Sequence, residues 1–361
     1  MVTANAERCI MLAAGGTGGH IFPAIAVADA LVVQAPELRC VFVGTEYGLE
    51  KRLVSQAGYP LEFIDVRYLK GTSLATKFKH GALLPRAAWQ CYKLLRKHKP
   101  GLVLGAGGYA SGPLVAMASM MDIPTAIMEQ NAIPGLTNRL LAGFVDKVFV
   151  SFEAERYAFA AHKVRALGNP VRNMSATADA ADGRFHLLVF GGSQGARSLN
   201  QQLPRILGSL GEAAQTLSVR HQAGRGQADA VREAYANFTG EVEVSEFIDD
   251  MPSAYANSQL IVCRAGATSV AEIKAAGRAA VLVPFPRAAH NHQEKNAQAM
   301  VDAGAAWMIR DRELEGDRLR ELLLECIAHP ERLQQRAQAA AALAQPNAAR
   351  DVAAECLTMC L

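Results

Sequence analysis

Cysteine pairs at the spacing used by metal sites and disulfide frameworks are absent from this chain of 361 residues. The chain has seven cysteines, an odd number, and no two of them have the C-x-x-C spacing. Zinc sites and disulfide-bonded scaffolds depend on regularly spaced cysteines, so the sequence predicts free thiols in a reducing compartment. No D-x-D occurs either, and the histidines are not spaced as a ligand set. We therefore expect no bound metal.

Two common phosphate-binding signatures are also missing. Neither of two prominent glycine loops, Gly15–His20 and Gly191–Arg197, carries the G-K-[ST] of a P-loop. Read from Gly16, the first loop lacks the last glycine of the dinucleotide fingerprint G-x-G-x-x-G. The missing glycine of the dinucleotide fingerprint argues against a nucleotide-binding oxidoreductase. We keep that different class of enzyme as an alternative.

Long apolar runs are lacking too. The uncharged window Gly101–Met121 is interrupted by five glycines and by Pro113, whereas a membrane-spanning helix needs about 20 continuous apolar residues. We expect strand, loop and helix there, and no transmembrane segment. The first residues hold no basic leader followed by a long apolar core, so no secretory signal is expected.

Acidic residues are absent between Asp65 and Asp122, where nine lysines and arginines occur. Residues 1–170 carry 18 Lys and Arg against 12 Asp and Glu, whereas the remaining residues carry 19 against 22. Because the second half is acidic and repeats no mixed aromatic and basic pattern, no nucleic-acid surface is expected.

The basic segment includes an amphipathic helix, predicted over Pro85–Lys97. The helical period places Cys91 and Leu95 on one face and Trp89 and Lys93 on the opposite one. An outward tryptophan among cations is typical of a surface for an anionic membrane, where each cation contributes about 1 kcal/mol. A solvated helix face is the alternative. The predicted membrane patch consists of Phe78, Lys79, Leu83, Trp89 and Lys93.

What the chain does contain is an alternation of short apolar runs with helical runs, which predicts βαβ units and parallel sheets. The strands expected in the first half are Cys9–Ala14, Arg39–Gly44, Leu61–Val66, Leu102–Gly105, Thr125–Glu129, Lys147–Ser151 and Val164–Leu167. After Gly168–Pro170 the pattern starts again, and the expected strands are His186–Gly191, Leu217–Gln222, Val242–Ile248, Leu260–Arg264, Ala280–Phe285 and Ala305–Ile309. An alanine-rich helical tail, broken near Pro330 and Pro346, follows.

The loop GGTGGH, Gly15–His20, lies between a strand and a helical run expected from Ile21 to Val33. Backbone N–H groups at a helix N-terminus favour an anion, and His20 can hold or move a proton near neutral pH. GAGGYASGP (Gly105–Pro113) and EQN (Glu129–Asn131) end other strands of the same sheet. Close helix–sheet packing would explain one such loop, but three at one edge predict a site.

The second half repeats this pattern in GGSQGAR, CRAGATSVAE and PFPRAAHNHQEKNA. Within CRAGATSVAE, Thr268 and Ser269 could serve a diphosphate, and Glu272 could accept hydrogen bonds from ribose hydroxyls. A capped helix, with Glu272 in a capping box, is the competing interpretation. A polar loop is the alternative for the third motif.

These motifs, with GNPVR and EFIDDM, occur in the order seen in the MurG family, which the chain resembles over essentially its whole length. The resemblance implies an α/β fold of two Rossmann-like domains with parallel sheets facing across a cleft, the GT-B glycosyltransferase type. It implies transfer of N-acetylglucosamine from UDP-N-acetylglucosamine to the C4 hydroxyl of the muramoyl sugar of lipid I, giving lipid II. The anomeric centre inverts, and no cofactor is implied.

The implied domains are residues 1–168 for acceptor and membrane, a linker at 169–184, a UDP-sugar domain at 185–340, and a helix at 341–361 packing back on the first domain. His20 is the predicted base and Glu129 its rival. The implied substrate-binding residues are Thr17, Gly18, Gly19, Asn131, Arg172, Ser193, Ile248, Arg264, Ala267, Thr268, Ser269, Val270, Ala271, Glu272 and Gln293. Ile248 is expected to meet the uracil through its backbone, Glu272 the ribose and Gln293 the sugar.

The partners implied are UDP-N-acetylglucosamine, lipid I, the anionic surface of the bacterial inner membrane on its cytoplasmic side, and other cell-wall synthesis or division proteins. Another GT-B enzyme, such as a glycolipid synthase or a UDP-sugar epimerase, is the first alternative. A non-catalytic module that binds a nucleotide sugar or a membrane is another.

Overall fold

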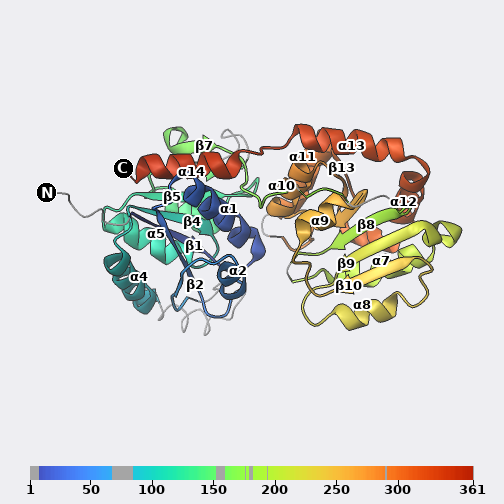
Figure 1. Ribbon diagram of the computed structural model, residues 1–361, viewed down its shortest axis with the longest axis horizontal. Helices are drawn as coiled ribbons and strands as arrows, with labels where there is room; N and C mark the ends of the chain where they lie inside the picture. Colours follow the sequence, from blue (N-terminus) through green and yellow to red (C-terminus); the bar gives the residue numbers. More distant parts are fainter. Residues whose placement is uncertain are drawn as a thin grey trace. The chain divides into compact units, whose positions relative to one another are not determined.

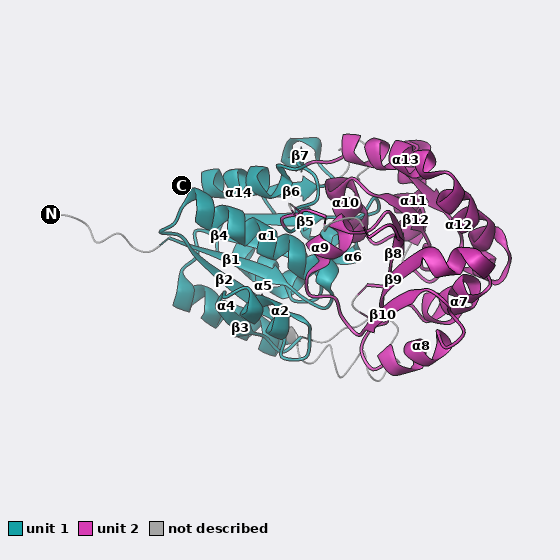
Figure 2. Ribbon diagram, turned by 45° about the vertical axis from the view of Figure 1, so that its right-hand side comes forward, with its two compact units in different colours: residues 1–172, 346–361 teal, residues 173–345 magenta. Residues whose placement is uncertain are grey.

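The computed structural model describes residues 8–66, 84–151, 159–174, 176–178, 182–192, 194–288 and 291–360 (Figure 1). The chain divides into two compact units. Unit 1 comprises Met1–Arg172 together with Pro346–Leu361, and unit 2 comprises Asn173–Gln345 (Figure 2). The chain therefore passes from unit 1 to unit 2 inside the segment expected to be a linker, and its last residues return to unit 1.

Unit 1 is built on a parallel sheet, whose order in the described residues is β3-β2-β1-β4-β5-β6-β7. Its central strands are buried on both faces, which is why they read as uninterrupted apolar runs. The strands are β1 (Cys9–Ala14), β2 (Arg39–Gly44), β3 (Leu61–Phe63), β4 (Leu102–Gly107), β5 (Thr125–Glu129), β6 (Lys147–Val150) and β7 (Val164–Ala166).

Helices follow these strands as crossover connections, as parallel pairing requires. They are α1 (Gly18–Gln34), α2 (Glu50–Gln56), α4 (Leu84–His98), α5 (Ser111–Met120) and α6 (Leu136–Leu141), with a 3-10 turn η2 (Ala161–Lys163). The last helix, α14 (Ala348–Met359), packs beside α1 (Figure 1). Gln34 Nε2, at the end of α1, donates to the Arg350 carbonyl at 3.0 Å. The chain end is thereby tied into unit 1.

Unit 2 repeats the design with a parallel sheet of order β10-β9-β8-β11-β12-β13 in the described residues. Its strands are β8 (Phe185–Phe190), β9 (Leu217–Gln222), β10 (Glu241–Ser245), β11 (Leu260–Cys263), β12 (Ala279–Leu282) and β13 (Ala306–Met308). Its helices are α7 (Arg197–Gly208), α8 (Ala228–Ala234), α9 (Met251–Ala256), α10 (Ala267–Ala276), α11 (His292–Asp302), α12 (Arg318–Ala328) and α13 (Pro330–Ala342), with 3-10 turns η3 (Gly211–Thr216) and η5 (Asp311–Glu315). Both sheet faces carry a buried apolar cluster.

Strand ends are the main difference from the sequence predictions. The strand predicted as Val242–Ile248 ends at Ser245, and the one predicted as Ala280–Phe285 ends at Leu282. The apolar residues beyond these ends leave the ladder to form loops at the carboxyl edge. Helix α1 begins at Gly18 rather than Ile21, so Gly18–His20 form its first turn.

The described helices include none that is both long enough and apolar enough to cross a bilayer. The seven cysteines are free thiols and six of them are buried. Burial raises the pKa of Cys40 and of Cys91 to about 12, which makes both thiols weak nucleophiles.

Candidate active site

The first two glycine loops of unit 1 interlock, because they follow the adjacent strands β1 and β4. Gly108 has φ +80°, and a Cβ on it would lie 2.1 Å from the Gly15 carbonyl oxygen. Gly107 has φ +105°, and a Cβ there would lie 2.4 Å from His20 Nδ1. Only glycine fits both the backbone angle and the contact at these two positions. The predicted convergence of these loops is confirmed.

A buried carboxylate fixes the loop Gly15–His20 by hydrogen bonding. Glu50, the first residue of α2, is 0% exposed. Its Oε2 accepts from the Gly16 N–H at 3.3 Å, and its Oε1 accepts from the Thr45 N–H and hydroxyl, both at 2.8 Å. A buried carboxylate is stable only when it is well hydrogen-bonded. Glu50 was not predicted, because nothing in the local sequence distinguishes it from a surface residue.

His20 lies in the first turn of α1, and its N–H donates to the Thr17 carbonyl at 3.1 Å. The ring is partly exposed, with Nδ1 buried on the Gly107 side. Thr17 is exposed, and Gly18 is buried against Phe22. A cation also lies at this end of the helix.

That cation is Arg172, the last residue of unit 1 before the chain passes into unit 2. Its guanidinium carbon lies 3.8 Å from the centroid of the Phe22 ring, a cation–π distance. Unit 1 therefore brings Thr17, Gly18, Gly19, His20 and Arg172 to the same end of α1.

Glu129 has a different environment from the one its predicted role requires. It is 2% exposed, and both carboxylate oxygens accept hydrogen bonds. Oε1 accepts from the backbone and side-chain nitrogens of Asn131 at 3.0 and 3.2 Å, and Oε2 accepts from Gly135 N and Asn138 Nδ2, each at 2.9 Å. This arrangement argues against Glu129 as a base. Its carboxylate orders the loop that carries Asn131.

In unit 2, the loop after β8 interlocks with the turn after β9. Gly195 has φ +73°, and a Cβ on it would lie 2.1 Å from the Ala223 carbonyl oxygen. Gly224 has φ +92°, and a Cβ there would lie 2.6 Å from Gly195 Cα. Ser193, predicted to bind the donor, lies outside the described residues.

The segment Ala267–Glu272 forms the first turns of α10, after the N-cap Gly266. No side chain caps this helix, so the capping-box interpretation of Glu272 is wrong. Glu272 is 4% exposed, and its Oε2 accepts from the Tyr255 hydroxyl at 3.1 Å.

The side chain of Val270 belongs to the apolar cluster, so only its backbone can meet a ligand. Ala267, Ser269 and Ala271 are partly exposed, and Thr268 is buried.

Arg264 proves to be an internal clamp. It is 8% exposed, and its guanidinium donates to Asp311 Oδ1 at 2.5 Å and to Ser198 Oγ at 2.8 Å. It also donates to the carbonyls of Val283 and Pro284 at 3.2 and 3.3 Å. Arg264 therefore joins the ends of β11 and β12 to the start of α7. Asp311 was not foreseen, because its proximity depends on tertiary packing.

Gln293, in the first turn of α11, closes the loop after β12. Its Oε1 accepts from the Phe285 N–H at 2.9 Å. Three residues later, buried Asn296 donates to the Ala265 carbonyl at 3.1 Å.

Ile248, between β10 and α9, is 2% exposed with its side chain in the core. Its backbone is therefore the part that can meet a ligand, as predicted.

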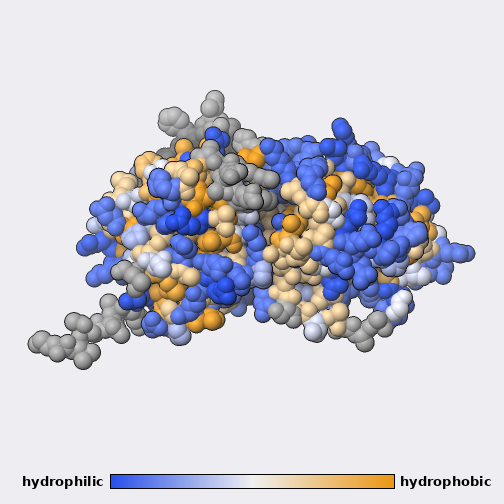
Figure 3. Space-filling view, turned by 90° about the horizontal axis from the view of Figure 1, so that it is seen from above, coloured by the Kyte–Doolittle hydropathy of each residue, from blue (hydrophilic) through white to orange (hydrophobic). Residues whose placement is uncertain are grey.

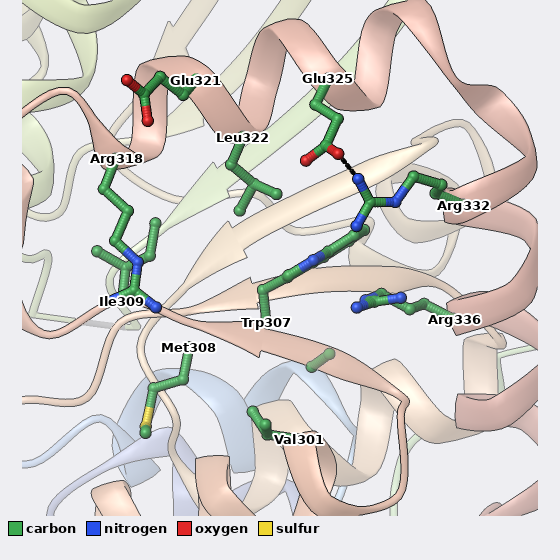
Figure 4. A pocket seen from close by; sticks show the side chains of 11 residues that line it. Val301, Trp307, Met308, Ile309, Arg318, Glu321, Leu322, Glu325, Arg332 and Arg336 are labelled. Atoms are coloured by element: carbon green, nitrogen blue, oxygen red, sulfur yellow. Dashed lines mark ion pairs between the residues drawn. The ribbon is translucent and has the colours of Figure 1, made fainter.

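A cavity of about 610 Å³ lies elsewhere in unit 2, beside the edge strand β13. Arg318 and Glu325 reach it from α12 and Arg332 and Arg336 from α13, and Glu325 pairs with Arg332 (Figure 4). The Arg336 guanidinium lies 3.8 Å from the Trp307 ring centroid. No predicted site residue lines this cavity.

On the outer face of α4, Trp89 is 56% exposed and Lys93 Nζ lies 3.6 Å from its ring centroid. Cys91 and Leu95 are buried, as the helical spacing predicts. Phe78, Lys79 and Leu83 lie outside the described residues. Further exposed apolar side chains of unit 1 are Met120, Leu136, Leu140 and Phe144. The face shown in Figure 3 is mainly hydrophilic, with smaller hydrophobic areas.

Two α/β units, each with a parallel sheet and a glycine loop between its first strand and first helix, have the architecture of GT-B glycosyltransferases. Residues 10–150 match the glycosyltransferase family 28 N-terminal domain, and residues 186–354 match the family 28 C-terminal domain. The chain also resembles the crystal structure of Acinetobacter baumannii MurG, with a TM-score of 0.77 and 32% identity, covering 97% of this chain and 99% of that one.

Two sequence relatives carry the same name, UDP-N-acetylglucosamine--N-acetylmuramyl-(pentapeptide) pyrophosphoryl-undecaprenol N-acetylglucosamine transferase. The one from Myxococcus xanthus (strain DK1622) is 46% identical, covering 97% of this chain and 92% of the relative. The one from Geotalea uraniireducens (strain Rf4) is 42% identical, covering 96% of this chain and 97% of the relative. The chain belongs to the MurG family of N-acetylglucosaminyltransferases.

Proposed function

We propose that this protein transfers N-acetylglucosamine from UDP-N-acetylglucosamine to the C4 hydroxyl of the muramoyl sugar of lipid I, releasing UDP and lipid II for peptidoglycan synthesis. The observation that carries the proposal is 46% identity, over 97% of the chain, to an enzyme named for this transfer. Glycine loops and polar side chains lie at the strand ends of each unit, where parallel sheets bind ligands.

Unit 2 is proposed to bind the UDP part of the donor. The Ile248 backbone would meet the uracil, Glu272 the ribose hydroxyls, and Gln293 the sugar. Support comes from the position of these residues at the carboxyl edge of one sheet, where parallel sheets bind ligands. Glu272 is held by Tyr255, and the start of α10 offers backbone N–H groups to the diphosphate.

Positive ends of helix dipoles would stabilise the charge that develops on the departing UDP. We assign this role to the first turn of α10, residues Ala267–Ser269, and to the loop with Ser193 before α7. No resident metal or cofactor enters the proposal. Arg264 would act through packing, because its guanidinium is already engaged by Asp311 and Ser198.

We propose that His20 removes the proton from the acceptor hydroxyl as the new glycosidic bond forms. Imidazole titrates near neutral pH, which suits a general base. Nδ1 is buried against Gly107, so Nε2 is the nitrogen we assign to proton transfer. Thr17, Gly18, Gly19, Asn131 and Arg172 would border the donor sugar and diphosphate.

Unit 1 is proposed to rest on the cytoplasmic face of the inner membrane, where an undecaprenyl-linked acceptor is anchored. Support comes from the exposed Trp89 beside Lys93 and from the exposed apolar side chains of Leu136, Leu140 and Phe144. Aromatic and cationic side chains together favour anionic bilayer interfaces. Other cell-wall synthesis or division proteins are further proposed partners.

An acceptor-choice assay tests the proposal. Radiolabelled UDP-N-acetylglucosamine is supplied with a lipid I analogue, with diacylglycerol, or with no acceptor. We expect label in a lipid II analogue alone. Label in diacylglycerol would indicate the glycolipid-synthase alternative, and an epimerised sugar nucleotide without transfer would indicate the epimerase.

A further inference from the structure

One buried amide joins two loops of the proposed donor site. Gln222, the last residue of β9, is 4% exposed. Its Nε2 donates to the Gly192 carbonyl at 3.0 Å, and its Oε1 accepts from the Ile248 N–H at 3.1 Å. Reversing the amide would place donor against donor and acceptor against acceptor, so the backbone partners fix its orientation.

The position of Gln222 in the sheet explains its reach. In the strand register, Gln222 pairs with Phe190 at the end of β8 and with Ser245 at the end of β10. The chain leaves β8 toward the glycine loop Gly191–Arg197 and leaves β10 toward Ile248. The side chain of Gln222 thus spans the loops on both sides of its own strand.

This contact decides what Ile248 can offer a ligand. The Ile248 N–H is used by Gln222, and the Ile248 carbonyl receives no hydrogen bond from the described residues. The carbonyl is therefore the Ile248 backbone group that remains to accept a hydrogen bond from a nucleobase. Uracil carries a donor at N3, whereas cytosine carries a lone pair there and would be repelled.

We propose that Gln222 is a positioning residue that fixes the Ile248 carbonyl for recognition of the uracil N3–H. Through its bond to Gly192, the same side chain fixes the position of the glycine loop Gly191–Arg197 relative to Ile248. This inference rests on the proposed donor site and adds a residue that acts through Ile248 and Gly192. It also makes the preference for uridine over cytidine nucleotides depend on Gln222.

Two substitutions separate the two arms of the link. Gln222→Met keeps the length and removes both hydrogen bonds. Gln222→Glu keeps an acceptor for Ile248 but sets an oxygen against the Gly192 carbonyl. Both should raise the KM for UDP-N-acetylglucosamine about tenfold or more, since buried groups lose partners, with a smaller change in kcat.

The second readout is the ratio of the inhibition constants of CDP and UDP in the transferase assay. Gln222→Met should lower this ratio about fivefold, because a loosened carbonyl discriminates less well between N3–H and a lone pair. A change in overall stability alone would not move the ratio. Thermal melting of each variant verifies that it is folded.

Gln259→Met is the matched control. Gln259 Oε1 accepts from the His186 N–H at 2.6 Å, so it makes the same kind of bond in the same unit, at the amino end of the sheet. Its KM and its CDP to UDP ratio should match wild type. An unchanged ratio in Gln222→Met, or an equal KM rise in Gln259→Met, overturns the inference. Absence of transfer by the wild type would instead refute the proposed function.

Discussion

Acid pH should weaken unit 2 through one buried histidine, His221 on β9. His221 is 0% exposed, with Nδ1 2.9 Å from the Tyr235 hydroxyl and Nε2 3.2 Å from Asn200 Oδ1. Asn200 donates through its amide nitrogen to the Ala223 carbonyl at 2.8 Å, so its oxygen is the acceptor. Nε2 of His221 therefore carries the proton, and Nδ1 accepts from Tyr235.

The size of the effect follows from the burial of this ring. Burial lowers the pKa of His221 from 6.5 to about 4. Between these values the unfolded chain binds a proton that the folded chain does not, so stability falls as the pH falls. The contribution is fully present above pH 6.5 and is lost on approaching pH 4. At about 1.4 kcal/mol per pKa unit, the full loss is about 3 kcal/mol.

The chain's two tryptophans allow this loss to be measured in unit 2 alone. A Trp89→Phe variant retains only Trp307, on β13, as the fluorescent reporter. Urea unfolding between about pH 7 and about pH 5 should show a steady decline in unfolding free energy.

The matched variant is His221→Gln in the same background. Its side chain is neutral at every pH, so its decline should be shallower by the share due to His221, although its stability at pH 7 is lower. Parallel declines in the two proteins would refute the assignment of the pH dependence to this ring.

Three further predictions concern the proposed site and the membrane patch. Glu50→Gln should lower stability by about 1–3 kcal/mol in thermal melts and reduce kcat, because donors of Gly16 or Thr45 lose their acceptor; wild-type values would refute this. Glu272→Ala should weaken UDP binding about tenfold or more by calorimetry, and unchanged binding removes the ribose assignment. Trp89→Ala should reduce binding to anionic vesicles severalfold with turnover on a water-soluble acceptor unchanged; undiminished vesicle binding would exclude this patch.

The sequence allowed the architecture to be predicted because parallel strands are buried on both faces and read as apolar runs. The strand Cys9–Ala14 and the break in the tail near Pro330 were predicted correctly. The end of β10 was predicted too far along the chain. Ile248 packs its apolar side chain into the core, although its backbone lies beyond the last residue of the strand. Apolar character alone does not separate these two situations.

The site residues that escaped prediction are polar groups whose partners are distant in the sequence. Glu50 accepts from Gly16, 34 positions away, and Gln222 joins segments 30 and 26 positions away. Glu129 shows the same limit, since its place at a strand end does not reveal the four donors that its carboxylate meets in the fold. Local sequence indicates where a polar group lies along the chain, and packing decides what it contacts.

Transfer by wild type and His20→Ala, with each protein saturated with UDP-N-acetylglucosamine, tests the central claim most directly. The assay follows conversion of a lipid I analogue and determines the anomeric configuration of the new bond. We expect the wild type to form the inverted product. We expect His20→Ala to turn over about 10²–10⁴-fold more slowly with donor affinity little changed. No transfer by the wild type, or near-wild-type turnover by His20→Ala, would contradict the account.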